Sequence, residues 1–268
     1  MTHAKVIFFG EHAVVYGKRA ISIPLVEMNI FVELIKTNKV QKRDLVLDYI
    51  AKKAGVDNKT FIKINSKIPT GRGLGSSAAL SVAVAKANKQ QNIRKIADEC
   101  EKFIHITPSG IDVSQVLSDR ALIFSKNEEI VEFDFKLNAY LLIIDTKIVG
   151  VTKEAVLRVR KNYENNKKYL NFLGEVTEEA IAELKKGDIK KVGRLMNISQ
   201  KLLKKIGVSH KKNDEVVKIC TNNGAVGAKL TGGGDGGCCI ALVENLKTSK
   251  NIKKLLEKRG FSVWIVTV

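Results

Sequence analysis

The hydrophobic and polar positions along the chain follow two different spacings. Continuous or alternating apolar positions predict strands. These predicted strands lie at residues 4–9, 61–68, 139–144, 225–231, 238–243 and 262–268. Residues 19–36 predict strand pairs, because 21–23 and 29–34 are rich in residues that favour strands. Residues 121–135 predict a β-hairpin with its turn near 126–128.

Apolar residues at intervals of three and four predict helices in the rest of the chain. These predicted helices lie at 44–53, 80–87, 93–104, 152–170, 177–186, 188–206 and 249–258. The pattern changes near 136–140, where long amphipathic helices begin to dominate. We therefore expect two domains, 1–137 and 138–268.

Residues 69–79, Pro-Thr-Gly-Arg-Gly-Leu-Gly-Ser-Ser-Ala-Ala, connect a predicted strand to a predicted helix. Three glycines at alternate positions allow backbone N–H groups to converge on an anion, and a helix N-terminus opened by Ser76 and Ser77 favours phosphate. The Walker pattern would need a Lys before the Ser pair, and the dinucleotide fingerprint would need Gly at 76 or 78. Taken alone, the segment is either a phosphate-binding loop or a flexible turn before a well-capped helix.

Three further polar residues are candidates for chemistry. Asp112 follows a helix break at Pro108 and Gly110, so it is either a charge that complements a helix dipole or a carboxylate aimed into a cleft. Glu11 and His12 follow the first predicted strand. A single Glu-His pair beside a glycine is more often structural than catalytic.

Composition indicates a folded protein. The chain has 268 residues, of which 44% are hydrophobic and 28% charged, which suits one large or two ordinary domains with proper cores rather than disorder. The four cysteines, Cys100, Cys220, Cys238 and Cys239, have no C-x-x-C spacing, so we expect neither disulfides nor a zinc site. The sequence has no signal-peptide pattern and no apolar run of about 18 residues. We expect a soluble cytoplasmic protein with no membrane partner.

The formal net charge of +18 raises the question of nucleic-acid binding. The alternative is a lysine-rich surface of the kind found in heat-adapted proteins. The lysines are spread over 36–67, 161–168, 185–212 and 247–258, and aromatic residues make up only 6%. We therefore expect no nucleic-acid partner, and a nucleic-acid-binding module is the less favoured alternative.

Three separated motifs, at residues 5–18, 69–79 and 229–238, resemble in order the signature motifs of the GHMP small-molecule kinase superfamily. Gly-Glu-His-Ala-Val-Val-Tyr-Gly-Lys at 10–18, with 196–200 and 207–210, resembles the archaeal-type mevalonate kinases within it. The resemblance covers nearly the whole chain. It implies an α+β fold in which a ribosomal-protein-like N-terminal domain, which binds ATP and carries catalysis, joins a ferredoxin-like C-terminal domain, with the active site between them.

The resemblance also implies roles for single residues. Asp112 would be the catalytic base, assisted by Lys5, and Ser77 and Glu101 would bind Mg²⁺. The residues implied to bind the ATP phosphates are Gly71, Arg72, Gly73, Leu74, Gly75, Ser76, Ser77 and Ala78. The residues implied to contact the substrate are Glu11, His12, Thr152, Thr231 and Gly233.

The reaction that the resemblance implies is ATP-dependent phosphorylation of the primary hydroxyl of mevalonate to 5-phosphomevalonate, with Mg²⁺ as cofactor. The chemistry agrees, because phosphoryl transfer needs charge neutralisation and positioning, and Mg²⁺ prefers oxygen ligands. The alternatives within the superfamily are phosphomevalonate kinase and homoserine kinase. Mevalonate and ATP are the expected partners, and a homodimer is left open.

The sequence departs from the pattern of the superfamily at four places. Only four residues precede Lys5, and the region between 36 and 60 is short, which would alter the adenine pocket. Asp235 interrupts the glycine run of the third motif. Gly150 stands where some mevalonate kinases carry an Arg near the substrate carboxylate, so the cation that binds this group is left open.

Overall fold

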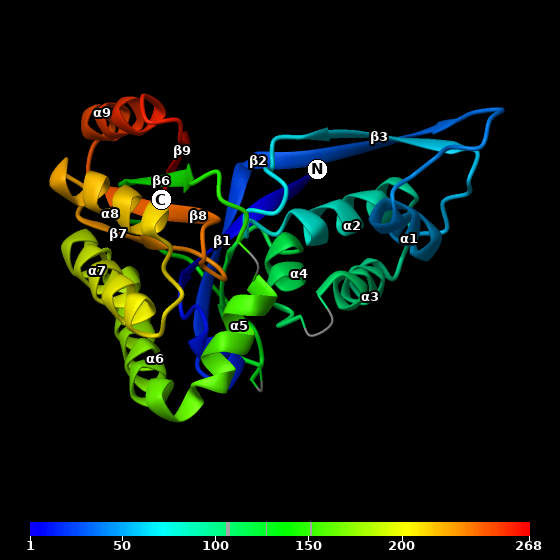
Figure 1. Cartoon of the computed structure of the whole chain (residues 1–268). Coiled ribbons are helices and arrows are strands. Elements are labelled where there is room, and N and C mark those ends of the chain that lie inside the picture. The colour runs from blue at the N-terminus through cyan, green and yellow to red at the C-terminus, as the bar shows by residue number, and fades with distance from the viewer. Residues whose placement is uncertain (106–107, 127, 151) are drawn as a thin grey trace. The chain divides into compact units, whose positions relative to one another are not determined.

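The computed structural model describes residues 1–105, 108–126, 128–150 and 152–268. The chain, drawn in Figure 1, divides into two compact units. The first unit contains Met1–Lys5, Pro24–Thr70 and Leu74–Asp119, and the second contains Val6–Ile23, Gly71–Gly73 and Arg120–Val268. Strands β1 (Thr2–Phe9) and β2 (Ala20–Lys36) each continue from one unit into the other.

In the first unit, β2 pairs with β3 (Thr60–Ser66) in an antiparallel ladder from Ile30↔Ser66 to Lys36↔Thr60. Strand β2 is one continuous strand of 17 residues, so the expectation of separate strand pairs within 19–36 is wrong. Pro24 does not break it, because Pro24 lies between the stretch that pairs with β4 and the stretch that pairs with β3. The N–H that proline lacks is therefore not needed in either ladder.

Four helices complete the first unit, namely α1 (Leu45–Lys53), α2 (Ser76–Ala87), α3 (Ile93–His105) and α4 (Ile111–Val116). Helix α2 contacts α1, α3 and α4, and its residues 78, 79 and 81–85 are buried. The predicted apolar helix after the glycine-rich loop is thus confirmed, and it begins at the predicted serine pair. Ile106 and Thr107, in the predicted helix break, lie outside the described residues.

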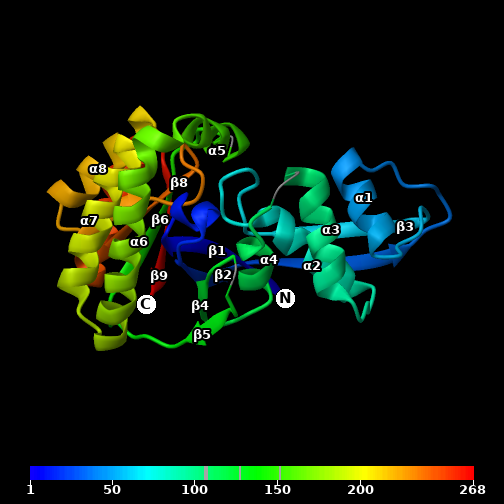
Figure 2. The same ribbon diagram turned by 90° about the horizontal axis from the view of Figure 1, so that it is seen from below.

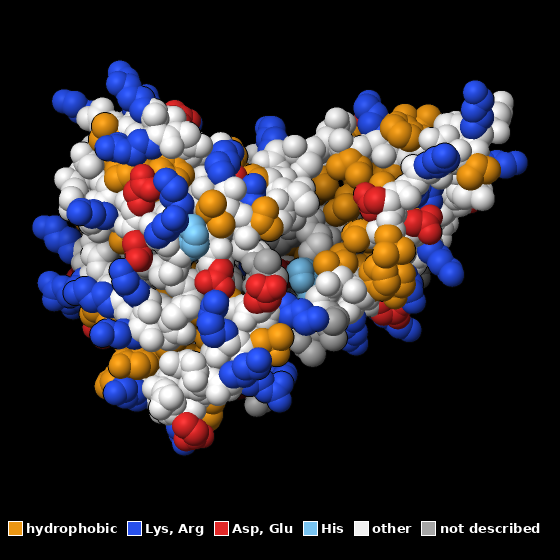
Figure 3. All heavy atoms as spheres, in the orientation of Figure 1, with side chains coloured by type: hydrophobic (Ala, Val, Ile, Leu, Met, Phe, Trp, Pro, Cys, Tyr) orange, Lys and Arg blue, Asp and Glu red, His pale blue; other side chains and the backbone are white. Residues whose placement is uncertain are grey.

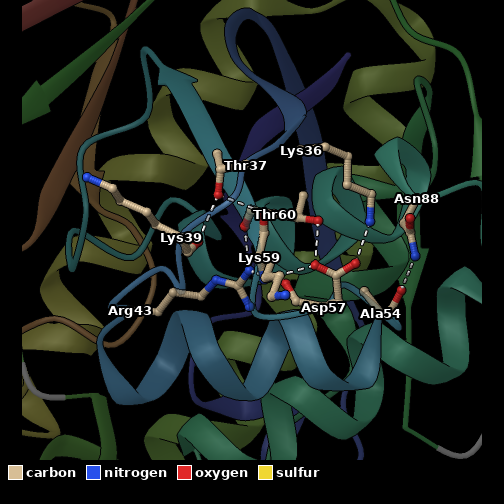
Figure 4. Close-up of polar contacts among 9 residues, drawn as sticks. All are labelled: Lys36, Thr37, Lys39, Arg43, Ala54, Asp57, Lys59, Thr60 and Asn88. Atoms are coloured by element: carbon tan, nitrogen blue, oxygen red, sulfur yellow. Dashed lines mark hydrogen bonds and ion pairs between the residues drawn. The ribbon is translucent and has the colours of Figure 1, made fainter.

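Polar contacts secure the short connections around α1 (Figure 4). Asp57 accepts hydrogen bonds from the Lys59 N–H (2.9 Å) and the Thr60 hydroxyl (2.8 Å), and it pairs with Lys36. Arg43 donates to the carbonyl of Asp57 at 2.7 Å, and Thr37 donates to the carbonyl of Lys59 at 2.8 Å. These bonds join the segment before α1 to the segment after it. The short region 36–60 is therefore held together by hydrogen bonds between the segments on either side of α1.

The second unit contains a four-stranded antiparallel sheet in the order β7-β8-β6-β9. Its strands are β6 (Tyr140–Asp145), β7 (Gly227–Leu230), β8 (Cys238–Val243) and β9 (Ser262–Thr267). Helices separate β6 from β7, and α9 (Leu246–Glu257) separates β8 from β9. This βαββαβ order on an antiparallel sheet is the ferredoxin-like arrangement, so the predicted α+β class is confirmed.

The other helices of the second unit are α5 (Thr152–Lys161), α6 (Tyr163–Lys186), α7 (Ile189–Lys205) and α8 (Lys211–Asn222). Helices α6 and α7 lie side by side in both views (Figures 1 and 2). The predicted break between 170 and 177 is wrong, because α6 is continuous there. Gly174 serves close packing instead: a Cβ on it would lie 2.9 Å from Cδ of Lys18.

Helix α8 was not predicted, although its start carries a local signal. His210 accepts a hydrogen bond from the Lys212 N–H, and Asn213 accepts one from the His210 N–H, which together form a capping box. The remaining elements are the 3₁₀ helix η1 (Ala13–Tyr16) and the strands β4 (Ala121–Phe124) and β5 (Val131–Phe133). Strands β4 and β5 form the predicted hairpin, and Asn127 of its predicted turn lies outside the described residues.

Within the described ranges, none of the helices combines the length and the apolar character that crossing a membrane requires. All four cysteines are buried free thiols.

Candidate functional site

The residues expected to act in the reaction fall into two groups, one in each unit. Lys5, Ser77, Glu101 and Asp112 lie in the first unit with residues 74–78 of the glycine-rich loop and helix α2. The expected substrate contacts lie in the second unit, together with Gly71, Arg72 and Gly73.

Lys5 and Asp112 form an ion pair, with 2.8 Å between Nζ and Oδ1. The Lys5 side chain is only 3% exposed, whereas that of Asp112 is 31% exposed. Lys5 lies on β1 and Asp112 in the first turn of α4, after Gly110, whose φ of 86° starts that helix. Asp112 is therefore held by a buried cation, partly exposed, and placed in the first turn of a helix.

The glycine-rich loop meets Lys5 directly. Gly75 is the N-cap of α2 with a φ of 72°, in the left-handed region that glycine adopts without strain. A Cβ on Gly75 would lie 3.1 Å from Cγ and 3.2 Å from Cε of Lys5. The Lys5 N–H also donates to the carbonyl of Leu74 at 3.1 Å. The Lys5 side chain thus packs directly against the loop backbone and the start of α2.

Ser77 and Glu101 lie together, and His105 joins them. The Ser77 Oγ and the His105 Nε2 are 3.4 Å apart, and His105 Nε2 is 3.7 Å from Oε2 of Glu101. Burial is the main cause that raises the pKa of Glu101; a hydrogen bond from Ser77 lowers it, and the charge of Asp112 raises it further. His105 was missed from the sequence, although it lies four residues after Glu101 on the same helix, the spacing at which side chains meet.

The donor set in this group suits a small hard cation. The Glu101 side chain is 3% exposed, and its Oε1 has no hydrogen-bond partner among the described residues. A buried carboxylate oxygen beside a hydroxyl fits Mg²⁺, which takes few protein oxygens and keeps several waters. Over the described part of the chain, there is no cluster of three or more His, Cys, Asp or Glu that could hold a metal.

In the second unit, Glu11 pairs with Lys229, and both side chains are fully buried. Burial is the main cause that lowers the pKa of Lys229, and the charge of Glu11 opposes it. Lys229 also donates to the carbonyl of Leu230 at 2.8 Å. The pair connects the first and third sequence motifs, a long-range contact that the sequence did not indicate.

His12 lies against the third motif. It has a φ of 60°, and its Nε2 is 3.0 Å from the carbonyl oxygen of Gly233. Burial lowers the pKa of His12 to about 4, so the ring is neutral at pH 7. Thr152 packs on the same glycine, because a Cβ on Gly233 would lie 2.6 Å from Oγ1 of Thr152. Three of the expected substrate contacts are thus neighbours.

Thr231 and Arg72 hold the loops of the second unit in place. The Thr231 hydroxyl donates to the carbonyl of Ile7 at 2.8 Å and accepts from the Ile7 N–H at 3.1 Å. Arg72 Nε lies 3.1 Å from Oδ1 of Asp145, at the end of β6. The carbonyl of Arg72 would lie 3.3 Å from a Cβ on Gly237. Residues 71–73 therefore pack against β6 and the glycine turn of the third motif.

Two of the four departures noted in the sequence, Gly150 and Asp235, lie in this region. A Cβ on Gly150 would lie 2.5 Å from the carbonyl oxygen of Gly234, so the backbone leaves no space for a side chain there. Asp235 has a φ of 53° and forms an ion pair with Arg158 of α5. The negative charge in the glycine run thus has its own cation. The sequence pattern did not single out Arg158.

The basic residues are distributed over the surface. On the face in Figure 3, Lys and Arg side chains are spread and Asp and Glu side chains occur among them. Many of the lysines have acidic partners, such as Lys63 with Glu33 at 2.9 Å and Lys204 with Asp214 at 2.6 Å. This distribution differs from the single basic stripe typical of nucleic-acid-binding surfaces.

Comparisons with known proteins agree with these features. Residues 38–119 match the family of GHMP kinases N terminal domains, and residues 180–261 match that of GHMP kinases C terminal domains. The chain is 33% identical to a mevalonate kinase of Pyrococcus furiosus, over 90% of this chain and 88% of the relative. It is 34% identical to a mevalonate kinase of Methanocaldococcus jannaschii, over 95% and 94%. A solved structure of L. major mevalonate kinase in complex with R-mevalonate has a TM-score of 0.85 at 25% identity, covering 99% of this chain and 94% of that one.

Proposed function

The chain belongs to the GHMP kinase family, and we propose that it transfers the terminal phosphoryl group of ATP to the primary hydroxyl of mevalonate, giving 5-phosphomevalonate and ADP. The Lys5–Asp112 ion pair is the observation that carries this proposal. It combines a buried cation with an accessible carboxylate, next to the loop whose backbone suits phosphate.

Asp112 is the general base in this mechanism. Its carboxylate accepts the proton of the attacking hydroxyl as the new O–P bond forms, a contribution of about 10²- to 10⁴-fold in rate. Lys5, 2.8 Å away, holds the carboxylate in position, and its charge stabilises negative charge that develops on the transferring group. Lys5 is itself positioned by Gly75 and by the carbonyl of Leu74.

The glycine-rich loop holds the phosphates of ATP. The residues assigned to this role are Gly71, Arg72, Gly73, Leu74, Gly75, Ser76, Ser77 and Ala78. Positive φ values at Gly71, Gly73 and Gly75 support the assignment, because they allow N–H groups to turn toward one anion. The N-terminus of α2 adds a favourable dipole. The Arg72 side chain pairs with Asp145, so we assign the Arg72 backbone N–H to the phosphates and its side chain to fixing the loop.

Mg²⁺ is the cofactor in this proposal, and Ser77 and Glu101 hold it. The Oε1 of Glu101, which has no hydrogen-bond partner in the described ranges, and the adjacent hydroxyl of Ser77 support this role. When bound, the ion neutralises charge on the phosphates of ATP. Lys5 supplies the neighbouring protein cation, and no further carboxylate is required of the protein.

The substrate is contacted from the second unit by His12, Thr152 and Gly233, which are neighbours there. Neutral His12 can exchange a hydrogen bond with a hydroxyl without adding charge. Glu11 and Thr231 are assigned to the same subsite. Their bonds to Lys229 and to Ile7 indicate that they act by positioning the chain around it.

The wider setting follows from the same proposal. We assign the enzyme to the cytoplasm, which its buried free thiols support. A domain boundary at 137/138 and a homodimer remain predictions, and no nucleic-acid partner is proposed.

The test is ADP release with mevalonate, phosphomevalonate and homoserine, on the wild type and on Asp112→Asn. Mevalonate-dependent turnover that falls by about 10²- to 10⁴-fold in Asp112→Asn is the expected result. The asparagine keeps an acceptor for Lys5, so thermal unfolding should change little. Preference for one of the other two alcohols would replace the proposed substrate, and an unchanged rate in Asp112→Asn would remove the proposed base.

A further inference from the structure

A substrate that carries a carboxylate requires a cation. The cationic side chains near the substrate-side residues differ in their exposure to solvent and in how fully their donors are used by ion pairs. Lys229 is fully buried and committed to Glu11. Arg72 is 17% exposed; its Nε pairs with Asp145, and its Nη1 is buried without a hydrogen-bond partner among the described residues. Arg158 is 47% exposed, and within the described part of the chain its ion pair with Asp235 is formed by Nη2. Arg158 is thus the member of this set with donors still facing solvent.

Arg158 is held close to the substrate-side residues by two connections. Helix α5 begins at Thr152, which packs on Gly233, and Arg158 lies on the same helix. Asp235, two residues after Gly233, pairs with the guanidinium. The charges of Asp235 and Arg158 both act on His12, which itself lies against Gly233. The ion pair with Asp235 therefore places Arg158 at the glycine turn that His12 and Thr152 contact through Gly233.

The glycine turn is a rigid support for this arrangement. The Asp235 N–H donates to the carbonyl of Val208 at 2.8 Å, and the Gly237 N–H donates to that of Ile148 at 2.9 Å. A Cβ on Gly234 would lie 2.1 Å from the carbonyl oxygen of Val208, so the turn is packed to backbone contact. The carboxylate of Asp235 is consequently fixed, and it orients one edge of the guanidinium while the other N–H groups remain available.

We infer that Arg158, oriented by Asp235, binds the carboxylate of the substrate and thereby selects acceptors that carry a carboxylate. A guanidinium presents five N–H donors in a planar fork, so it can contact two carboxylates at once, one from Asp235 and one from the substrate. The inference rests on the proposed function for the identity of the acceptor, mevalonate. It adds a specificity-determining residue on α5.

The experiment compares wild type, Arg158→Gln and the control Arg160→Gln, which removes a charge from an exposed position on the same helix. Binding of R-mevalonate is measured by calorimetry without ATP, and kcat and KM are measured by ADP release. Because a charge-assisted hydrogen bond is lost, Arg158→Gln should weaken mevalonate binding and raise its KM by about 10- to 100-fold. The KM for ATP and the kcat at saturating mevalonate should stay within about 2-fold of wild type.

The amide of mevalonate, which keeps the primary hydroxyl but has no charge, separates carboxylate recognition from general damage. Arg158→Gln and wild type should use the amide equally well, whereas they differ on mevalonate. Asp235→Asn, which suits the positive φ of that position, should raise the KM for mevalonate by a smaller factor and leave kcat unchanged.

If wild type phosphorylates mevalonate and Arg158→Gln binds mevalonate as tightly as wild type does, this inference is wrong and the proposed function still holds. Equal losses on mevalonate and on the amide would also overturn it, because the effect would not depend on the carboxylate. Wild type that neither binds nor phosphorylates mevalonate would overturn both.

Discussion

Gly75→Ala should impair catalysis through the position of Lys5. Gly75 has a φ of 72°, and an alanine in this region costs about 1–2 kcal/mol. The added Cβ would lie 3.1 Å from Cγ and 3.2 Å from Cε of Lys5. Lys5 is only 3% exposed, so it can move aside only by disturbing its 2.8 Å contact with Asp112. One methyl group therefore tests whether that contact matters.

Two magnitudes follow from this geometry. The backbone strain should lower the midpoint of thermal unfolding by about 2–8 °C, given about 2–4 °C per kcal/mol for a chain of this size. A shift of a few tenths of an ångström in Lys5 and in the start of α2 should lower kcat by about 10-fold, since a displacement of about 1 Å can cost about 100-fold.

Gly260→Ala is the matched control, because Gly260 has a φ of 85° and no described heavy atom within 4 Å of its added Cβ. It carries the strain without the contact. Both variants are compared by thermal unfolding and by ADP release at saturating mevalonate and ATP. A kcat for Gly75→Ala within 2-fold of that for Gly260→Ala would refute the reasoning, since strain alone would then account for the result.

Three further predictions concern groups in the second unit. Lys229→Met should lower the free energy of unfolding by about 3–5 kcal/mol, because the buried Glu11 loses the cation of Lys229. The double variant Lys229→Met with Glu11→Leu should recover most of that stability. Chemical denaturation measures both variants, and a loss below about 1 kcal/mol in Lys229→Met would contradict the argument. His12 should make the free energy of unfolding fall by at most about 3 kcal/mol as the pH drops from about 6.5 to 4, because the unfolded chain binds a proton there that the folded protein does not. This loss should be absent above pH 6.5 and in His12→Asn. Equal slopes of unfolding free energy against pH in the two proteins would refute it. Arg72→Gln should raise the KM for ATP with little effect on the KM for mevalonate, because the glycine-rich loop loses its ion pair with Asp145. Steady-state kinetics with each substrate varied in turn measures both constants. A rise in the KM for mevalonate alone would show that Arg72 contacts mevalonate instead.

The spacing of apolar residues predicted helices and strands correctly where their formation depends on residues close together in the sequence. Alternation predicted β3, and an apolar run after two serines predicted α2 and its start. Helix ends were less predictable. The break predicted between 170 and 177 does not occur, because the continuity of α6 depends on packing with residues far along the chain, such as Lys18 against Gly174. The start of α8, by contrast, carries a local signal in its capping box.

From local spacing alone, the sequence predicted most of the helices and strands, because periodicity and glycine placement are local properties. The resemblance of its three motifs to the GHMP kinases predicted the α+β class and the candidate site residues. Only the tertiary structure decided which of these residues meet. Lys5 with Asp112, Lys229 with Glu11 and Arg158 with Asp235 are pairs whose members lie far apart in the chain. Burial and charge pairing between such residues depend on how strands and helices pack, and no spacing along the sequence encodes that packing.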